Sequence, residues 1–169
     1  FRRVLFRSSL TYVQHEHCAV AASMAYARKT QKVGVSSVTC GPGLTQIMTA
    51  LPAAVRAKIP MVIFAGESPL GKSWYNQQIE QRPFVEATGA RYIQLHTSKR
   101  FEQGIQEAFL MAVRERIPVV VGTPFDLLHA DTAGEPQNEP PWYEVYQGSV
   151  SIPSGQSSEI RRLADLLTR

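Results

Sequence analysis

The sequence predicts an α/β fold in which a parallel β-sheet carries helices on both faces. Short β-branched or apolar runs alternate with segments of helical periodicity roughly 10 to 15 residues long, which is the pattern of βαβ units. The runs at residues 61–65 and 119–121 are almost entirely apolar. Such runs are typical of parallel strands that are covered on both faces. The fold class therefore follows from the order and composition of the segments.

The first half of the chain is expected to form three strands and two helices. In order, these are a strand at residues 10–14, a helix at 16–29, a strand at 33–38, a helix at 43–57 and a strand at 61–65. The first helix is predicted by its alanine content. The second is predicted by apolar residues at three- and four-residue spacings. Pro52 lies inside this second helix, so a kink or a break is expected there.

The second half begins with a long loop at residues 67–82, which has no clear periodicity. Its aromatic pair, Trp74 and Tyr75, is expected to pack against the protein, and the alternative is that the pair lines a substrate pocket. The next elements are a short helix from Pro83 to Gly89, a strand at 91–95, a helix capped by Ser98 and ending near Arg114, and a strand at 119–121. The alternation of strand and helix thus continues to the end of the predicted domain.

Composition divides the chain into four parts. Residues 9–130 hold the alternating pattern and form the predicted domain. Residues 131–157 are rich in Pro, Gly, Gln and Ser, and we expect a linker there. Residues 158–169 are amphipathic and are expected to begin a second domain that this chain lacks. Residues 1–8 have no link to the alternating pattern, so we expect a non-native or disordered tail.

Charge and composition argue against several classes of protein. The net charge is +4, and residues 1–8 contribute three arginines and no acidic residue. The remainder is close to neutral, so nucleic-acid binding is not expected. No run of about 18 apolar residues predicts a membrane span. The two cysteines, Cys18 and Cys40, form no disulfide framework, which is typical of a cytoplasmic protein.

Two junctions between strand and helix are candidate functional sites. Glu16 lies at the start of the first helix, between His15 and His17, where we expect its carboxylate to be partly buried. The alternative is an ordinary preference for acidic residues at helix N-termini, worth about 0.3 to 1 kcal/mol. Gly41-Pro42-Gly43 opens the second helix, where its backbone N–H groups could face a ligand. A simple tight turn explains it equally well.

Motifs of several other chemistries are absent from the sequence. There is no Walker P-loop, no GxGxxG and no G-x-S-x-G element, which argues against a P-loop enzyme, a nicotinamide or flavin Rossmann domain and a serine hydrolase. The histidines and cysteines around Glu16 lack the paired spacing of zinc ligands, so no metal site is predicted.

The chain resembles the N-terminal pyrimidine-binding (PYR) domain of thiamine diphosphate-dependent enzymes, and within them the acetolactate synthase-like group. The resemblance covers about residues 10–130, and the first strand and helix of the family domain are expected to be missing before Leu10. It is carried by five segments: His15–Ala19, Met24–Arg28, Val33–Val35, Thr39–Thr45 and Ile59–Val62.

The resemblance implies a role for each candidate residue. The glutamate that matches Glu16 hydrogen-bonds a ring nitrogen of the cofactor's aminopyrimidine and favours the imino tautomer that deprotonates the thiazolium C2. Thr39, Pro42 and Gln46 match positions beside the pyrimidine, although many relatives have Asn where Gln46 stands. The segment Asn76–Gln81 stands in place of the Phe-Gln-Glu run of acetolactate synthases, and its residues Gln77 and Gln78 are expected to shape the substrate pocket.

By the same resemblance, the chain is a fragment of a lyase or transferase acting on 2-keto acids, by carboligation or decarboxylation. Mg²⁺ and the cofactor's diphosphate are then held by a missing C-terminal domain of a partner subunit in a homodimer or homotetramer, and the full-length protein could also carry FAD. The isolated fragment is expected to be inactive. The alternative is a non-catalytic α/β domain, descended from such enzymes, that serves dimerisation or regulation.

Overall fold

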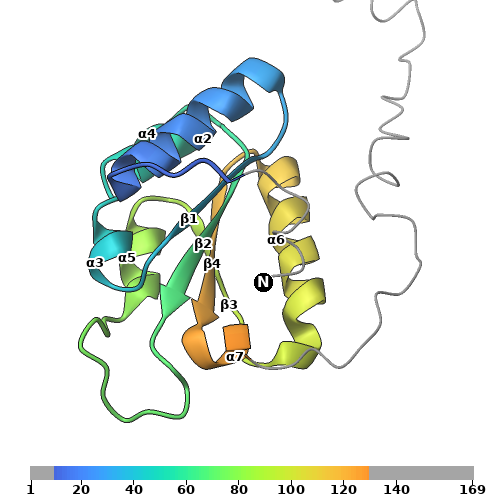
Figure 1. Ribbon diagram of the computed structural model, residues 1–169. Helices are drawn as coiled ribbons and strands as arrows, with labels where there is room; N and C mark the ends of the chain where they lie inside the picture. Colours follow the sequence, from blue (N-terminus) through green and yellow to red (C-terminus); the bar gives the residue numbers. More distant parts are fainter. Residues whose placement is uncertain (1–9, 130–169) are drawn as a thin grey trace, which may run out of the picture. The chain divides into compact units, whose positions relative to one another are not determined.

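A four-stranded, fully parallel sheet forms the centre of the domain. The computed structural model describes residues 10–129. Its strands are β1 (Gly34–Val38), β2 (Met61–Glu67), β3 (Arg91–Gln94) and β4 (Pro118–Pro124), and they lie in the order β1-β2-β4-β3. β2 pairs with β4 over its whole length, and the last pair joins Glu67 and Pro124. The predicted parallel sheet is therefore confirmed (Figure 1).

Helices cover both faces of the sheet, as predicted. They are α2 (Glu16–Thr30), α3 (Pro42–Thr45), α4 (Ala50–Arg56), α5 (Gln81–Ala87), α6 (Phe101–Glu115) and α7 (Phe125–His129), and the 3₁₀ helix η1 (Ser98–Arg100) precedes α6. In Figure 1, α2 and α4 lie on one side of the sheet and α6 lies on the other. Two hydrophobic clusters, one for each face, fill the space between the sheet and its helices.

The central strand β4 shows why helices have to cover both faces of the sheet. All seven of its residues are buried. Val120 belongs to the cluster beneath α2 and α4, whereas Val119 and Val121 belong to the cluster beneath α6. Burial of one such side chain contributes about 1.5 to 3 kcal/mol to folding. An apolar strand of this kind is therefore stable only when helices exclude water from both faces.

The predicted strand at residues 10–14 is wrong. This segment forms no ladder with any described strand, and Leu10 and Tyr12 are exposed. A strand needs a hydrogen-bonding neighbour, and β-branched composition alone does not supply one. β1 pairs with β2 on one side and with no described segment on the other.

The predicted break in the second helix occurs, but not at Pro52. The α-helix ends at Thr45 and a new one begins at Ala50; between them the N–H groups of Ile47 and Met48 bond carbonyls three residues earlier rather than four. Pro52 then lies in the first turn of α4, where its missing N–H costs little. A proline ring clashes with the carbonyl four residues earlier in a continuous helix, so the interruption has to precede Pro52.

The remaining elements match the predictions with shifted ends. α5 begins two residues before Pro83, and α6 begins at Phe101 because η1 takes the three residues from Ser98. The prediction that Ser98 caps this helix is therefore wrong. Thr97 is the N-cap residue of η1, and its side chain makes no capping hydrogen bond. α7 was not predicted. None of the helices among residues 10–129 is long and apolar enough to cross a membrane. The proposed tail, linker and second-domain helix lie outside the described residues.

Candidate functional site

The first component of the site is the start of α2, where Glu16 is the first helical residue. His15 adopts extended backbone angles (φ −146°, ψ 139°), and its Nδ1 accepts a hydrogen bond from the His17 backbone N–H at 3.1 Å. This cap begins the helix at Glu16 and leaves the Glu16 side chain half-buried, as expected. Among residues 10–129, no group forms a hydrogen bond or an ion pair with its carboxylate.

The second component is the turn between β1 and α3. Gly41 has φ +58°, which favours glycine, and Pro42 occupies the first turn of α3, where proline is well tolerated. A Cβ at Gly43 would lie 3.4 Å from Oε1 of Glu16 and would collide with Cγ2 of Thr39. The absent side chain of Gly43 thus lets Glu16 and Thr39 approach one another.

The structure therefore brings three of the predicted elements together: Glu16, Thr39 and the Gly41-Pro42-Gly43 turn. Thr39 and Pro42 are exposed, so a ligand can reach them. Gln46 caps the C-terminal end of α3 through its N–H, which donates to the Pro42 carbonyl at 3.1 Å, and it is also exposed. No contact between the Gln46 and Glu16 side chains is described.

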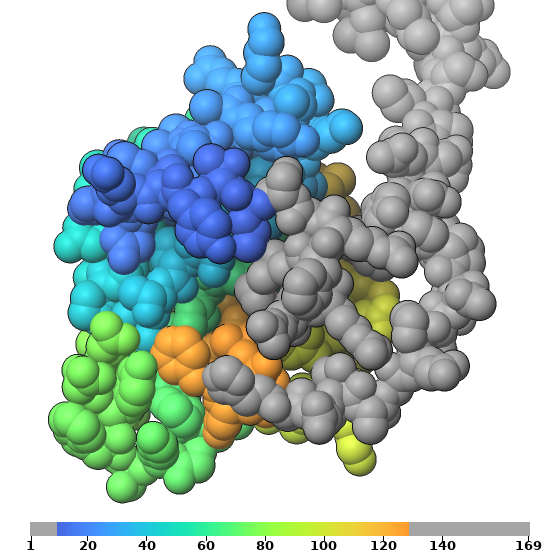
Figure 2. Space-filling model, viewed as in Figure 1, coloured from blue at the N-terminus to red at the C-terminus, as the bar shows by residue number. Residues whose placement is uncertain are grey.

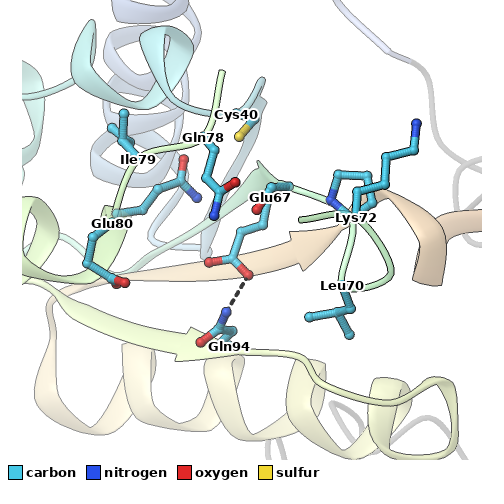
Figure 3. A pocket seen from close by; sticks show the side chains of 11 residues that line it. Cys40, Glu67, Leu70, Lys72, Gln78, Ile79, Glu80 and Gln94 are labelled. Atoms are coloured by element: carbon cyan, nitrogen blue, oxygen red, sulfur yellow. Dashed lines mark hydrogen bonds between the residues drawn. The ribbon is translucent and has the colours of Figure 1, made fainter. Parts of the chain in front are cut away.

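The loop between β2 and α5 packs directly on this turn. The Cys40 thiol donates to the backbone carbonyl of Gln77 at 3.4 Å, and a Cβ at Gly41 would collide with the same carbonyl. Gln78 lines a neighbouring cavity of about 240 Å³ together with Cys40 and Glu67 (Figure 3). The two glutamines that we assigned to the substrate pocket thus lie beside the turn, Gln77 through its backbone and Gln78 at the cavity.

A second carboxylate, which the sequence analysis missed, lies in this cavity. Glu67 ends β2 and accepts a hydrogen bond from the Tyr92 hydroxyl on β3. It also accepts one at 2.8 Å from Nε2 of Gln94, on the same strand (Figure 3). Gly122 of β4 leaves room for this arrangement, because a Cβ there would collide with the Tyr92 hydroxyl. The sequence signal was present: Glu67 follows an apolar strand and so stands at the same edge as the other site residues.

Burial and Glu67 together change the acidity of two neighbours. The pKa of Tyr92 is raised from its ordinary value of 10.0, first by burial and then by its hydrogen bond to Glu67. The pKa of the Cys40 thiol is raised from 9.0 by burial and by the negative charge of Glu67. Both groups therefore stay neutral at physiological pH, and Cys40 is not an activated nucleophile.

Helix α7 holds the far end of the β2–α5 loop. Asp126 Oδ2 accepts a hydrogen bond from the Gly71 N–H at 3.1 Å, and the rings of Phe125 and Tyr75 lie 5.8 Å apart. Figure 2 shows this loop, in green, as a projecting corner of the molecule beside α7, in orange. Tyr75 packs as predicted. Trp74 does not, because 75% of its surface is exposed.

The fold and the candidate site define the class: a parallel α/β domain whose candidate site residues lie near the carboxyl ends of its strands, where ligands bind in open α/β sheets. Comparison with known families makes this specific. Residues 7–87 match the family described as thiamine pyrophosphate enzyme, N-terminal TPP binding domain. This part of the chain belongs to that family.

Curated relatives that match the chain are acetolactate synthases. The isozyme 2 large subunit of Escherichia coli K12 is 28% identical over 153 residues, and the isozyme 3 large subunit is 31% identical over 168 residues. The alignments cover 89% and 92% of this chain. The chloroplastic acetolactate synthase 2 of Zea mays is 34% identical over 119 residues, or 68% of this chain. The chain spans only 18% to 27% of the length of these relatives.

Proposed function

We propose that this chain is part of a cytoplasmic, thiamine diphosphate-dependent enzyme that acts on 2-keto acids, with Glu16 as the residue that activates the cofactor. The acetolactate synthases to which it is similar support the reaction class, which includes carboligation and decarboxylation. The single observation that carries the assignment is the half-buried Glu16 carboxylate, which has no partner among the described residues and lies 3.4 Å from the space that a Cβ of Gly43 would fill.

The residues around that space fit the pyrimidine ring of the cofactor. Gly43 keeps the space between Glu16 and Thr39 free of a side chain, and the exposed Thr39 and Pro42 can contact a ring placed there. A flat, partly apolar heterocycle with hydrogen-bonding nitrogens suits such walls. Gln46 lies one helical turn further and completes the proposed contact set.

With the cofactor bound, the Glu16 carboxylate would take up a proton. Its carboxyl group shares that proton with a ring nitrogen of the pyrimidine, and partial burial reduces competition from water. When bound, thiamine diphosphate supplies the electron sink for cleaving or forming the bond next to the keto acid's carbonyl. Gln77 and Gln78 shape the space available to that acid.

The other half of the site is assigned to parts of the enzyme outside the described residues. No group of three or more His, Cys, Asp or Glu side chains within residues 10–129 could hold a metal ion. We assign Mg²⁺ and the diphosphate to a C-terminal domain of a partner subunit in a homo-oligomer. A middle domain that binds FAD is compatible with this organisation.

The test compares the full-length enzyme with this chain alone. The full-length enzyme, supplied with thiamine diphosphate and Mg²⁺, should exchange the cofactor's C2 proton for deuterium, as followed by NMR. The isolated chain should neither catalyse exchange nor bind the cofactor at micromolar concentration in calorimetry. Micromolar binding by the chain alone would contradict the divided site. A full-length protein without exchange would favour the non-catalytic dimerisation or regulatory role.

A further inference from the structure

A buried amide that takes no part in the proposed chemistry connects the site to the rest of the sheet. Gln81, the first residue of α5, is only 2% exposed. Its Oε1 accepts a hydrogen bond from the Gly41 N–H at 2.9 Å. Its Nε2 donates to the Gly66 carbonyl at 3.0 Å and lies 3.3 Å from the Tyr92 hydroxyl.

These partners belong to three separate segments: the β1–α3 turn, the end of β2, and β3. Burying an amide without partners costs at least about 1 to 3 kcal/mol, so a polar side chain at this depth is tolerated only because each end is engaged. If packing alone were required, a leucine or methionine would fill a similar volume without the free-energy cost of burying an amide. The presence of a buried amide at this position is therefore explained by the groups that it hydrogen-bonds, above all by the Gly41 N–H.

Gly41 needs an external partner because of its backbone conformation. At φ +58° and ψ −101° it lies outside helix and strand geometry, and its buried N–H points to Gln81. On its Cα side it is pressed against the Gln77 carbonyl, since a Cβ there would collide with that oxygen. Gly41 is thus held from two directions by residues of the β2–α5 segment.

The position of Gly41 fixes the position of Gly43. Gly43 is two residues further along a tight turn, and it lies against both Thr39 and Oε1 of Glu16. A shift of Gly41 by a few tenths of an ångström would carry Gly43 and Thr39 with it. Glu16 would keep its position, because it belongs to α2, which is anchored by its own contacts with the core.

We propose that Gln81 is a positioning residue that sets the Thr39–Gly43 turn at its working distance from Glu16. The catalytic consequence rests on the proposed function, whereas the effect on the turn does not. Gln81 is not a catalytic residue, because it touches neither Glu16 nor the space above Gly43. Its influence passes through the Gly41 N–H.

The experiment replaces Gln81 and a matched control in the full-length enzyme. Gln81→Met removes all three hydrogen bonds at similar volume. Gln103→Met is the matched control, because it makes the same replacement at an exposed position of α6, where the amide accepts a hydrogen bond from Arg100. Gln81→Glu keeps an oxygen that can accept from Gly41. The readouts are amide hydrogen exchange at Gly41, the KM for thiamine diphosphate, and C2 proton exchange at saturating cofactor.

We expect Gln81→Met to speed hydrogen exchange at Gly41 by about tenfold or more relative to the slowest core amides. C2 proton exchange at saturating cofactor should fall by about tenfold. Gln103→Met should leave both quantities unchanged, and Gln81→Glu should recover part of the protection at Gly41. If Gln81→Met is too unstable to study, Gln81→Asn, whose shorter side chain withdraws the acceptor from Gly41, decides the question: exchange at Gly41 at the wild-type rate would overturn the proposal.

The proposal is overturned if Gln81→Met lowers the melting temperature and leaves Gly41 protected, since the amide would then serve only stability. It is also overturned if Gln103→Met changes hydrogen exchange at Gly41 to the same extent. The proposed function fails separately: a full-length wild-type protein without C2 exchange would remove the catalytic readout, while hydrogen exchange at Gly41 would still test the positioning role.

Discussion

Two half-buried carboxylates stand near the same edge of the sheet, and their surroundings differ. Glu67 at the end of β2 is engaged by the Tyr92 hydroxyl and by the Gln94 amide. Glu16 at the start of α2 has no hydrogen-bonding partner among the described residues and faces the gap above Gly43. A buried charge that is already satisfied builds structure, whereas one left without partners is available to a ligand.

This contrast separates two properties that mutation can measure. Changes at Glu16 should alter chemistry and leave the fold intact. Changes at Glu67 should alter stability and reach the chemistry only indirectly. Each substitution is therefore a control for the other, because both remove one carboxylate near the same edge of the sheet.

The largest expected effect is that of Glu16→Gln in the full-length enzyme. Loss of a positioned proton carrier typically costs 10²- to 10⁴-fold, so C2 proton exchange should fall by at least about 100-fold. The melting temperature should change by no more than about 2 °C, since no described hydrogen bond is lost. Glu102→Gln, an exposed change of the same charge on α6, is the matched control and should affect neither quantity. Exchange at the wild-type rate in Glu16→Gln would refute the role.

The second effect concerns the gap itself. Gly43→Ala would drive a methyl group against Cγ2 of Thr39 and toward Glu16, so cofactor affinity should drop and stability should fall by about 1 to 3 kcal/mol. Thr39→Ser removes that Cγ2. The double variant should therefore recover part of both losses, and denaturant unfolding with cofactor titration measures the coupling. Strictly additive losses would show that the steric argument is wrong.

The third effect lies on the Glu67 side. Glu67→Gln offers one acceptor oxygen in place of two, so the charge-assisted hydrogen bonds from Tyr92 and Gln94 cannot both be kept in their present form. We expect the free energy of unfolding to fall by about 1 to 3 kcal/mol, with no comparable loss of C2 exchange. Chemical denaturation beside Glu16→Gln checks this. A stability loss larger in Glu16→Gln than in Glu67→Gln would reverse the comparison.

The smallest effect is a pH dependence that originates at Tyr92. Its pKa is raised above 10.0 in the folded protein, so the unfolded chain releases this proton first as the pH rises. The contribution of Tyr92 to stability is therefore complete below pH 10.0 and is lost above it. Tyr92→Phe should lose less stability than wild type between about pH 9 and about pH 11. Parallel curves for the two proteins would show that Tyr92 is not responsible.

Some of this architecture can be predicted from the sequence, and some cannot. The alternation of elements, the start of α2 at Glu16 and the turn at Gly41 each depend on residues within a few positions of one another. The strand at 10–14 failed because pairing depends on a neighbour that β-propensity does not provide. Helix α7 was missed because five residues carry too little periodicity to be recognised.

The sequence by itself determined the fold class, most of the strands and helices, and the candidate residues Glu16 and Gly43, because local conformational preferences and apolar spacing depend on adjacent residues. Thr39 became a candidate through the resemblance to the enzyme family. Only the tertiary structure decided which carboxylate is satisfied and what holds the turn. Gly41 and Gln81 are 40 positions apart, and Glu67 and Gln94 are 27 apart. Hydrogen bonds over such separations form only after the sheet has assembled, so no local pattern predicts them.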